Sequence, residues 1–436
     1  MNGTKMSNRG IFLVSVILTG AIAGAFIWLL LFCMNLGIGF LWERLPDYFG
    51  RYYPIWMCLI GGVVIGLFAR KYGPLPDELP EVMAKVKQTG RYEYDKLGRI
   101  SVAALLPMVF GGSIGPEAGL TGAIAGICTW VGDRMKGFGR QFRELTSVGT
   151  MAALSAIFTA PLFGVAGAMY GSHPNEENAV KEAPVITKGM KWFVYIAAFI
   201  GAVGAFLLLS GLFGGGLSLP HYTDIHVGTD ELLWMVPVVL VGGAAGWLYN
   251  VCDVYLHRYA QQHSGRPVLK AVVAGLLLGV IGFYLPFTMF AGEVQAEELN
   301  GVWMEMGVAV LLATGFVKVL VTSMCINMGW RGGQFFPLIF AGISIGYGMS
   351  LATGIDPVFC LCVSTAALLG TALRMPVMAT LLLFLCFPVA GVVFMLAAAF
   401  IGSKIPLPRY VAENMKGMAG KSSERDTETS EPDPSE

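Results

Sequence analysis

Charged residues are scarce in this chain. Asp, Glu, Lys and Arg make up 13% of its 436 residues, whereas 55% of the residues are hydrophobic. Soluble globular domains carry about twice that charged fraction, so the composition excludes an ordinary soluble protein. The basic and acidic side chains also balance, giving a formal net charge of zero. No basic stripe remains that would predict binding to nucleic acid.

The residue patterns of enzymes and metal sites are missing as well. None of the five histidines has metal-ligand spacing, and the eight cysteines contain no Cys-x-x-Cys pair and lie mostly in apolar segments. We therefore expect free, buried thiols without a bound metal or cofactor. An integral-membrane enzyme would need a nucleophile with a base, or clustered acids, at membrane depth. The sequence shows neither, so we do not expect an enzyme.

Long segments without any charged residue dominate the chain instead. They cover residues 11–42, 192–223, 271–292, 332–355 and 375–403. Each reaches the roughly 20 residues that a transmembrane helix needs. The sequence therefore predicts an all-α, polytopic protein of the lipid bilayer, and its basic termini favour the cytoplasmic side for both ends.

We divide the chain into three parts. Residues 1–10 form a cytoplasmic N-terminus, residues 11–403 form the membrane domain, and residues 404–436 form a cytoplasmic tail that is largely disordered. A polar link separates the membrane domain into halves of about 11–222 and 231–403.

One carboxylate stands out in the first half. Between residues 100 and 132 the only charged side chain is Glu117, within Gly111-Gly-Ser-Ile-Gly-Pro-Glu-Ala-Gly119. A lone carboxylate at membrane depth costs about 2.5–3.5 kcal/mol on insertion scales and by default marks a functional site. The Gly-Pro pair before it predicts the start of a helix, with Pro116 in the first turn and outward-pointing amides that attract anions.

The second half carries a related arrangement. Gly332-Gly333-Gln334-Phe335-Phe336-Pro337 follows a span in which Lys318 is the only charge. Each half also has a later segment interrupted by proline, at Pro161 and Pro376. Glycine- and proline-interrupted segments at matching places of two halves indicate a binding site where the repeats meet.

Together these motifs resemble the CLC family of chloride channels and proton-coupled chloride transporters. Residues 333–337 match the family's G-x-F-x-P motif completely, and Phe158-Thr-Ala-Pro-Leu-Phe-Gly164 is similar to its F-N-A-P-L-x-G helix. The resemblance covers about residues 11–405. It implies two inverted halves with broken and re-entrant helices, in a homodimer with one pore per subunit. It also implies a multi-pass location in the cell (inner) membrane.

The family's G-x-E-G-P motif fits in two registers. Matching the Gly-Pro pair places Ile114 at the family's gating glutamate. Matching Gly115-Pro116-Glu117 to G-x-E keeps the acid but loses the final proline. We prefer the second register, because it keeps the only carboxylate of this segment at the mouth of the anion path.

The other family positions match less well. For the G-S-G-I-P motif, one register places Asp77 at the anion-coordinating serine, whereas the register that we favour places Gly73 there. Gly171 stands where proton-coupled members carry an inner glutamate, which argues against proton coupling by that route. For the family's C-terminal tyrosine, Pro408 or Tyr410 lies near the expected place.

We therefore predict a pathway for chloride or a related small anion. The anion would be held by helix N-terminal amides around Gly73, Ser113–Pro116 and Gly333–Phe336, and gated by Glu117 as a tethered competitor. The alternatives are an anion/proton antiporter, a fluoride-selective exporter or a non-conducting scaffold. In a structural interpretation, Glu117 only caps a helix or pairs with Lys318, which would itself be a structural or snorkelling charge.

Overall fold

The computed structural model describes residues 2–46, 50–77, 81–82, 85–86, 89, 91–134, 150, 188–215, 220–384 and 386–415. Regular structure in these residues is helical, with one isolated antiparallel β-bridge. The elements, in chain order, are α1 (Asn2–Ile38), the π-helix η1 (Gly39–Arg44), α3 (Tyr53–Tyr72), α5 (Leu97–Val109), α6 (Pro116–Arg134), α9 (Lys188–Phe213), α10 (Thr229–Gln262), α11 (Pro267–Tyr284), the short 3-10 helix η3 (Pro286–Thr288), α12 (Glu293–Met306), α13 (Val308–Asn327), α14 (Phe335–Thr353), α15 (Pro357–Leu373), α16 (Pro376–Leu383), the 3-10 helix η4 (Val389–Gly391) and α17 (Val392–Lys404).

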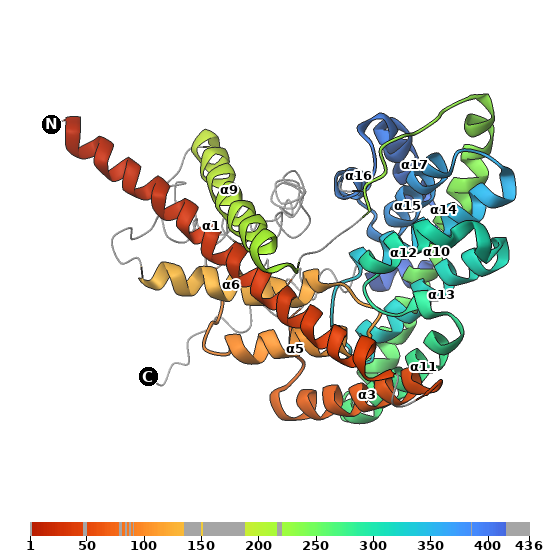
Figure 1. Cartoon of the computed structure of the whole chain (residues 1–436), viewed down its shortest axis with the longest axis horizontal. Helices are drawn as coiled ribbons and strands as arrows, with labels where there is room; N and C mark the ends of the chain where they lie inside the picture. The colour runs from red at the N-terminus through yellow and green to blue at the C-terminus, as the bar shows by residue number, and fades with distance from the viewer. Residues whose placement is uncertain are drawn as a thin grey trace.

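Seven described helices are long and apolar enough to cross a membrane, or up to eight if the bent pair Val389–Lys404 and Arg409–Met415 counts as one span. Figure 1 shows α1, α5, α6 and α9 on one side of the molecule and the block from α10 to α17 on the other. Helices α3 and α11 pack against each other at the bottom of this view. The predicted all-α, polytopic membrane fold is confirmed.

The helix ends follow from residues that the sequence supplies at each terminus. Pro54, Pro267, Pro357 and Pro376 each occupy the first turn of a helix, where the missing N–H costs nothing. The Asp356 carboxylate accepts a hydrogen bond of 2.7 Å from the Phe359 amide and so caps α15. These signals place each helix start within a residue or two.

Glycines let the helices approach closely. A Cβ atom at Gly62 of α3 would lie 2.5 Å from the Ala271 carbonyl oxygen of α11, and one at Gly275 of α11 would lie 2.3 Å from the Cys58 oxygen of α3. Helix α10 meets α15 in the same way, since a Cβ atom at Gly246 would lie 2.4 Å from the Leu368 oxygen. Small residues at such crossings are typical of membrane helices, because packing rather than the hydrophobic effect holds them together.

The core lies around α14. Of the most apolar part of this helix, 89% is buried inside the protein, compared with 28% for α9 and 33% for α11. Helix α14 packs between α13 and α15, and its first turn faces α6 of the other half. A helix with apolar residues all round belongs in such a fully enclosed position.

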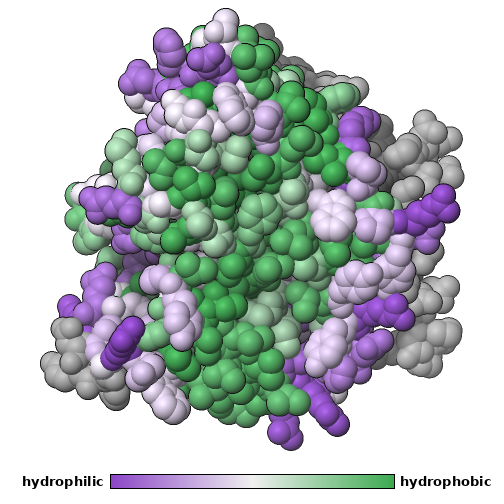
Figure 2. Space-filling model, turned by 90° about the vertical axis from the view of Figure 1, so that its right-hand side faces the viewer, coloured by the Kyte–Doolittle hydropathy of each residue, from purple (hydrophilic) through white to green (hydrophobic). Residues whose placement is uncertain are grey.

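The outer surface of the α10–α17 block is apolar. Figure 2 shows a continuous hydrophobic surface on this side of the molecule, with hydrophilic residues gathered toward its margins. Leu233, Val236 and Leu240 of α10 and Leu276 and Leu277 of α11 are exposed. Exposed leucine and valine side chains in such numbers fit contact with lipid acyl chains.

Two of the predicted spans differ from the helices of the structure. The segment expected to continue to residue 292 stops at Tyr284, and η3 follows it before α12 begins at Glu293. The run of residues 375–403 is two helices, α16 and α17, because Pro388 interrupts it. The segment with Phe158–Gly164 and Gly171, and the tail from residue 416, lie outside the described residues, so the predictions made for them stay untested.

Candidate functional site

The two glycine motifs predicted to form a shared site meet in space. The Gly115 amide donates to the Gly333 carbonyl oxygen at 2.7 Å, and the Gly333 amide donates back to the Gly115 oxygen at 2.7 Å. This pair is an isolated antiparallel bridge between the halves of the chain. It fixes the start of α6 directly against the start of α14.

Glu117 lies in the first turn of α6 and is 1% exposed. Its Oε1 accepts a hydrogen bond of 2.7 Å from the Phe335 amide, which belongs to the first residue of α14. Its Oε2 is also buried, and no hydrogen-bond partner for it is present among the described residues. The carboxylate therefore lies at the positive end of α14, where an N–H group binds an anion.

Glycines on both sides make the space that the carboxylate fills. A Cβ atom at Gly333 would lie 1.9 Å from Glu117 Oε1, and one at Gly115 would lie 2.0 Å from Oε2. No side chain fits at either position while Glu117 is in this conformation. Glycine is thus required here for close approach, as expected of a backbone cradle around an anionic group.

The neighbouring predicted residues complete the enclosure. Pro116 and Ile114 are buried, and the Ile114 side chain packs on Gly332, where a Cβ atom would lie 2.3 Å from its Cδ1 atom. Phe335 and Phe336 are 7% and 1% exposed. Ile114 is thus a packing residue, and the register with Glu117 at the gating position is the one that brings a carboxylate to α14.

Gln334 occupies the position just before α14. Its side-chain oxygen accepts a hydrogen bond from the Tyr249 hydroxyl group of α10. Tyr249 is 3% exposed. The sequence analysis did not single out Tyr249, although a polar side chain in the middle of an apolar span was a visible signal.

Lys318 is buried but does not pair with Glu117. Its Nζ atom donates to the carbonyl oxygens of Met289 at 2.8 Å, Phe290 at 2.7 Å and Phe287 at 3.5 Å, and it lies 5.0 Å from the centre of the Phe340 ring. None of the ion pairs in the described part of the chain includes Glu117 or Lys318. Lys318 therefore has a structural role in this conformation.

Glu293 is a second buried acid that the sequence analysis missed. It begins α12, is 8% exposed, and its Oε2 has no hydrogen-bond partner within the described segments. It is close enough to interact electrostatically with Lys318 and with Glu117. The sequence signal was weak, because Glu293 directly follows an apolar run and resembles an ordinary span end.

A cavity of about 350 Å³ lies beside the Gly111 turn that leads to Glu117. Met289 and Trp42 line this cavity, and both lie 2.8 Å from the position of a Cβ atom at Gly111. The Phe290 amide donates to the Gly111 oxygen at 3.1 Å. The remaining lining residues are Arg51, Pro54, Gly282, Phe283, Pro286 and Phe290.

Gly73 does not begin a helix. It ends α3 with φ of 86°, and its amide donates to the Ala69 oxygen at 2.9 Å. The expected helix start at Gly73 is therefore wrong, because the turn after α3 closes the preceding helix. Its predicted anion contact stays a prediction that this geometry does not favour.

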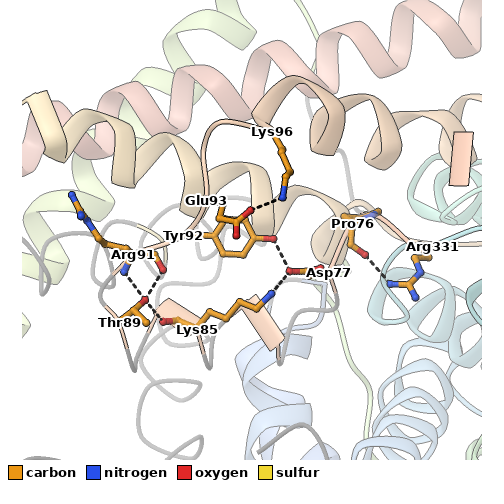
Figure 3. Close-up of polar contacts among 9 residues, drawn as sticks. All are labelled: Pro76, Asp77, Lys85, Thr89, Arg91, Tyr92, Glu93, Lys96 and Arg331. Carbon is orange, nitrogen blue, oxygen red and sulfur yellow. Dashed lines mark hydrogen bonds and ion pairs between the residues drawn. The ribbon is translucent and has the colours of Figure 1, made fainter. Parts of the chain in front are cut away.

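The following segment is held by a polar cluster that Figure 3 shows. The Asp77 carboxylate accepts from Lys85 at 2.8 Å and from the Tyr92 hydroxyl group at 2.9 Å. Arg331, from the loop before α14, donates to the Pro76 oxygen at 3.1 Å. Asp77 is thus neutralised by Lys85, and its role in this conformation is to anchor the loop.

The charges of this cluster also act on each other. Burial raises the pKa of Tyr92, and the negative charge of Asp77 raises it further. Burial acts to lower the pKa of Lys85, but the hydrogen bond and charge of Asp77, together with the charges of Glu81 and Glu93, outweigh that effect and leave the pKa raised. Tyr92 is therefore a neutral hydrogen-bond donor, and Lys85 keeps its positive charge.

Tyr410 contacts the end of α10. Its hydroxyl group accepts a hydrogen bond of 2.6 Å from Arg258, and its ring stacks on Tyr255 with 5.7 Å between the ring centres. None of these described contacts involves Glu117 or the first turn of α14. The structure therefore gives no support to Tyr410 as an anion ligand.

The comparisons with known proteins agree with this fold. The family model described as voltage gated chloride channel matches residues 61–406. The chain is 25% identical over 346 residues to YfeO of Salmonella choleraesuis (strain SC-B67), whose name describes an ion-transport protein, and the match covers 77% of this chain and 78% of YfeO.

Two solved structures share the fold at low sequence identity. A slow cyanobacterial Cl⁻/H⁺ antiporter superposes with a TM-score of 0.71 at 18% identity, covering 92% of this chain and 94% of the antiporter. A CLC-type fluoride/proton antiporter superposes with a TM-score of 0.65 at 17% identity, covering 93% and 96% of the two chains. The chain is a multi-pass membrane protein that belongs to the voltage gated chloride channel (CLC) family of anion transport proteins.

Proposed function

We propose that this protein carries chloride or a related small anion through a pathway at the start of α14, and that Glu117 is its gate. The observation that carries the proposal is the 2.7 Å hydrogen bond between the Phe335 amide and Glu117 Oε1. An anionic group of the chain itself occupies the positive end of a buried helix. A small inorganic anion would use the same N–H groups once the carboxylate leaves.

The site is suited to transport rather than to tight binding. The charge of Lys318 is directed to three carbonyl oxygens, so no described cation contacts the Glu117 carboxylate. A helix N-terminus contributes about 0.3–1 kcal/mol, and up to about 2 kcal/mol when partly buried. Such weak binding allows an anion to leave again, which conduction requires.

Glu117 gives the gate its pH dependence. The ionised carboxylate competes with a bound anion for the Phe335 amide, whereas the protonated acid loses that competition. Passive flow through such a gate is the primary proposal, and anion/proton antiport is the alternative. The two antiporters of similar fold favour this alternative, which a polar face of α10 described below also supports. We propose further that the protein is a homodimer in the cell (inner) membrane, as its family membership suggests.

The test is anion efflux from liposomes that contain the purified protein, with external pH recorded. Chloride, fluoride and nitrate are compared for the natural protein, Glu117→Gln and Glu298→Gln, a matched control on the exposed face of α12. We expect flux that Glu117→Gln alters and Glu298→Gln does not. No flux of any anion would contradict the proposal and leave a non-conducting scaffold. Proton uptake against the anion gradient would select the antiport alternative.

A further inference from the structure

One face of α10 carries a polar stripe that the anion pathway alone does not explain. Tyr249, Asp253, His257 and Gln261 follow one another at intervals of four residues. Residues with this spacing lie one above the other on the same helix face. Helix α10 runs without a break to Gln262 and so keeps the four side chains in register along it.

Hydrogen bonds connect the stripe to the end of α13. Asn327 donates from Nδ2 to Asp253 Oδ1 at 2.7 Å, and its own oxygen lies 3.2 Å from His257 Nδ1. The Gln261 side-chain nitrogen lies 2.8 Å from His257 Nε2. One assignment satisfies every contact, namely a neutral imidazole that donates from Nδ1 to Asn327 and accepts at Nε2 from Gln261.

The stripe runs from the surface into the protein. Gln261 is exposed, His257 and Asp253 are half-buried, and Tyr249 is buried. The Tyr249 hydroxyl group donates to Gln334, which immediately precedes the Phe335 amide that holds Glu117. Polar side chains thus extend from solvent to the residue beside the gate.

The exposed end of the stripe lies on the basic side of the membrane domain. Arg70 and Lys71 end α3, whose last turns pack against the start of α11, just after Arg266. Arg266 belongs to the short loop that joins the end of α10, where the stripe is exposed, to the start of α11. An excess of arginine and lysine marks the cytoplasmic side of a membrane protein, so the stripe opens to the cytoplasm.

We propose that this face of α10 is a cytoplasmic proton route to Glu117, with His257 and Asp253 as the proton-carrying groups. The inference rests on the proposed gating role of Glu117 and on the antiport alternative of the proposed function. Polar or ionisable residues in line across a membrane segment are typical of proton relays.

The proton balance is simple. A proton from the cytoplasm binds the neutral His257 imidazole, and the imidazolium gives a proton to the Asp253 carboxylate one helical turn away. From Asp253 the proton continues past Tyr249 and Gln334 to the ionised Glu117 carboxylate. Each carrier returns to its starting state, and the protonated Glu117 releases the Phe335 amide, so that an anion can take its place.

Among the described residues, few other charges face Asp253. His257 and Cys252 of its own helix are the titratable groups that act on it electrostatically or lie next to it, and α13 presents only Asn327 and Ser323. Helix α15 meets other faces of α10, through Thr371 at Asn250 and Leu368 at Gly246. His257 is therefore the described titratable group whose charge acts on Asp253.

The experiment measures chloride efflux and proton uptake together in liposomes. Asp253→Asn is compared with Asp253→Glu, which restores a carboxylate, and with the control Asp230→Asn at the exposed opposite end of α10. We expect Asp253→Asn to lose proton uptake, down to the level of protein-free liposomes, and to slow chloride efflux, because an ionised Glu117 then stays at the Phe335 amide. Asp253→Glu should recover proton uptake, and Asp230→Asn should match the natural protein.

Other outcomes overturn the proton route in separate ways. Unchanged proton uptake in Asp253→Asn would exclude Asp253 as a carrier. Chloride efflux without proton uptake in the natural protein would remove the route and leave the anion pathway in place. If both Asp253 variants lost chloride efflux as well, Asp253 would be a structural part of the pathway. Only the absence of chloride, fluoride and nitrate efflux alike from the natural protein would contradict the proposed function itself.

Discussion

The Glu117 carboxylate lies where a side chain of Gly333 would begin, 1.9 Å from the position of a Cβ atom there. The two residues are far apart in the sequence and belong to different halves of the chain. Their contact, together with the backbone bridge between Gly115 and Gly333, makes the first turns of α6 and α14 a single site. Glu117 and the Phe335 amide that donates to it are therefore supplied by separate halves, and the site is incomplete without both.

Substitution Gly333→Ala should displace Glu117 from the start of α14. The added methyl group cannot share space with the carboxylate, so we expect anion efflux to lose its dependence on pH, as in Glu117→Gln. Adding Glu117→Gln to Gly333→Ala should then cause little further change. Gly301→Ala is the control, since a Cβ atom there meets no other atom within 4 Å. Retention of the natural pH profile in Gly333→Ala would show that the carboxylate does not occupy this position.

Much of this arrangement follows from local sequence signals. The Gly-Pro start of α6, the lone Glu117 and the matching motif before Phe335 were all predicted, because glycine, proline and an isolated charge are unambiguous in an apolar chain. The sequence also predicted that the two motifs meet. Their bridge through Gly115 and Gly333 could not be derived, because backbone pairing between distant segments depends on tertiary packing.

The failures have physical causes as well. Gly73 resembles a helix start before proline, yet a glycine with positive φ is equally a helix end. His257 and Asp253 were not among the predicted site residues, because a charge in a hydropathy profile usually marks the end of a span. In the structure they lie on one face of α10, where contacts with α13 satisfy them. The sequence signal was the recurrence of polar residues every four positions, which a hydropathy profile does not take into account.

Lys318→Met should strongly destabilise the membrane domain. The substitution leaves the carbonyl oxygens of Met289 and Phe290 without their donor and removes the positive charge near Glu293. Leaving a buried hydrogen-bonding group unsatisfied costs about 1–3 kcal/mol, and two carbonyl oxygens lose their donor here. Thermal unfolding in detergent should show a lower midpoint, and adding Glu293→Gln should recover part of the loss. Lys404→Met, at an exposed position, is the control. An unchanged midpoint for Lys318→Met would contradict the buried role of this lysine.

Tyr92→Phe should weaken the anchor of the loop after α3. The substitution removes the hydrogen bond to Asp77 but leaves the Lys85 ion pair, so we expect a cost of about 1.5–3 kcal/mol, as for hydrogen bonds to charged groups. Lys96→Ala removes an ion pair whose partners are 53% and 73% exposed, and it should cost no more than about 1 kcal/mol. Chemical unfolding monitored by tryptophan fluorescence measures both. Equal effects of the two substitutions would argue that the Tyr92 contact is not formed.

Ser113 and Thr322 offer a test of the contact between the halves that does not involve any charge. Their hydroxyl oxygens are 3.1 Å apart, and both side chains are fully buried. Ser113→Ala or Thr322→Val alone leaves one buried hydroxyl group without its partner, which costs about 1–3 kcal/mol. The double variant removes both groups, so its loss of stability should be smaller than the sum of the single losses.

Residues in direct contact show coupling of about 0.5–3 kcal/mol in such cycles, whereas distant residues add within about 0.5 kcal/mol. Strict additivity would mean that the Gly111–Pro116 turn does not lie against α13, and the position of Glu117 at the start of α14 would then lose its support.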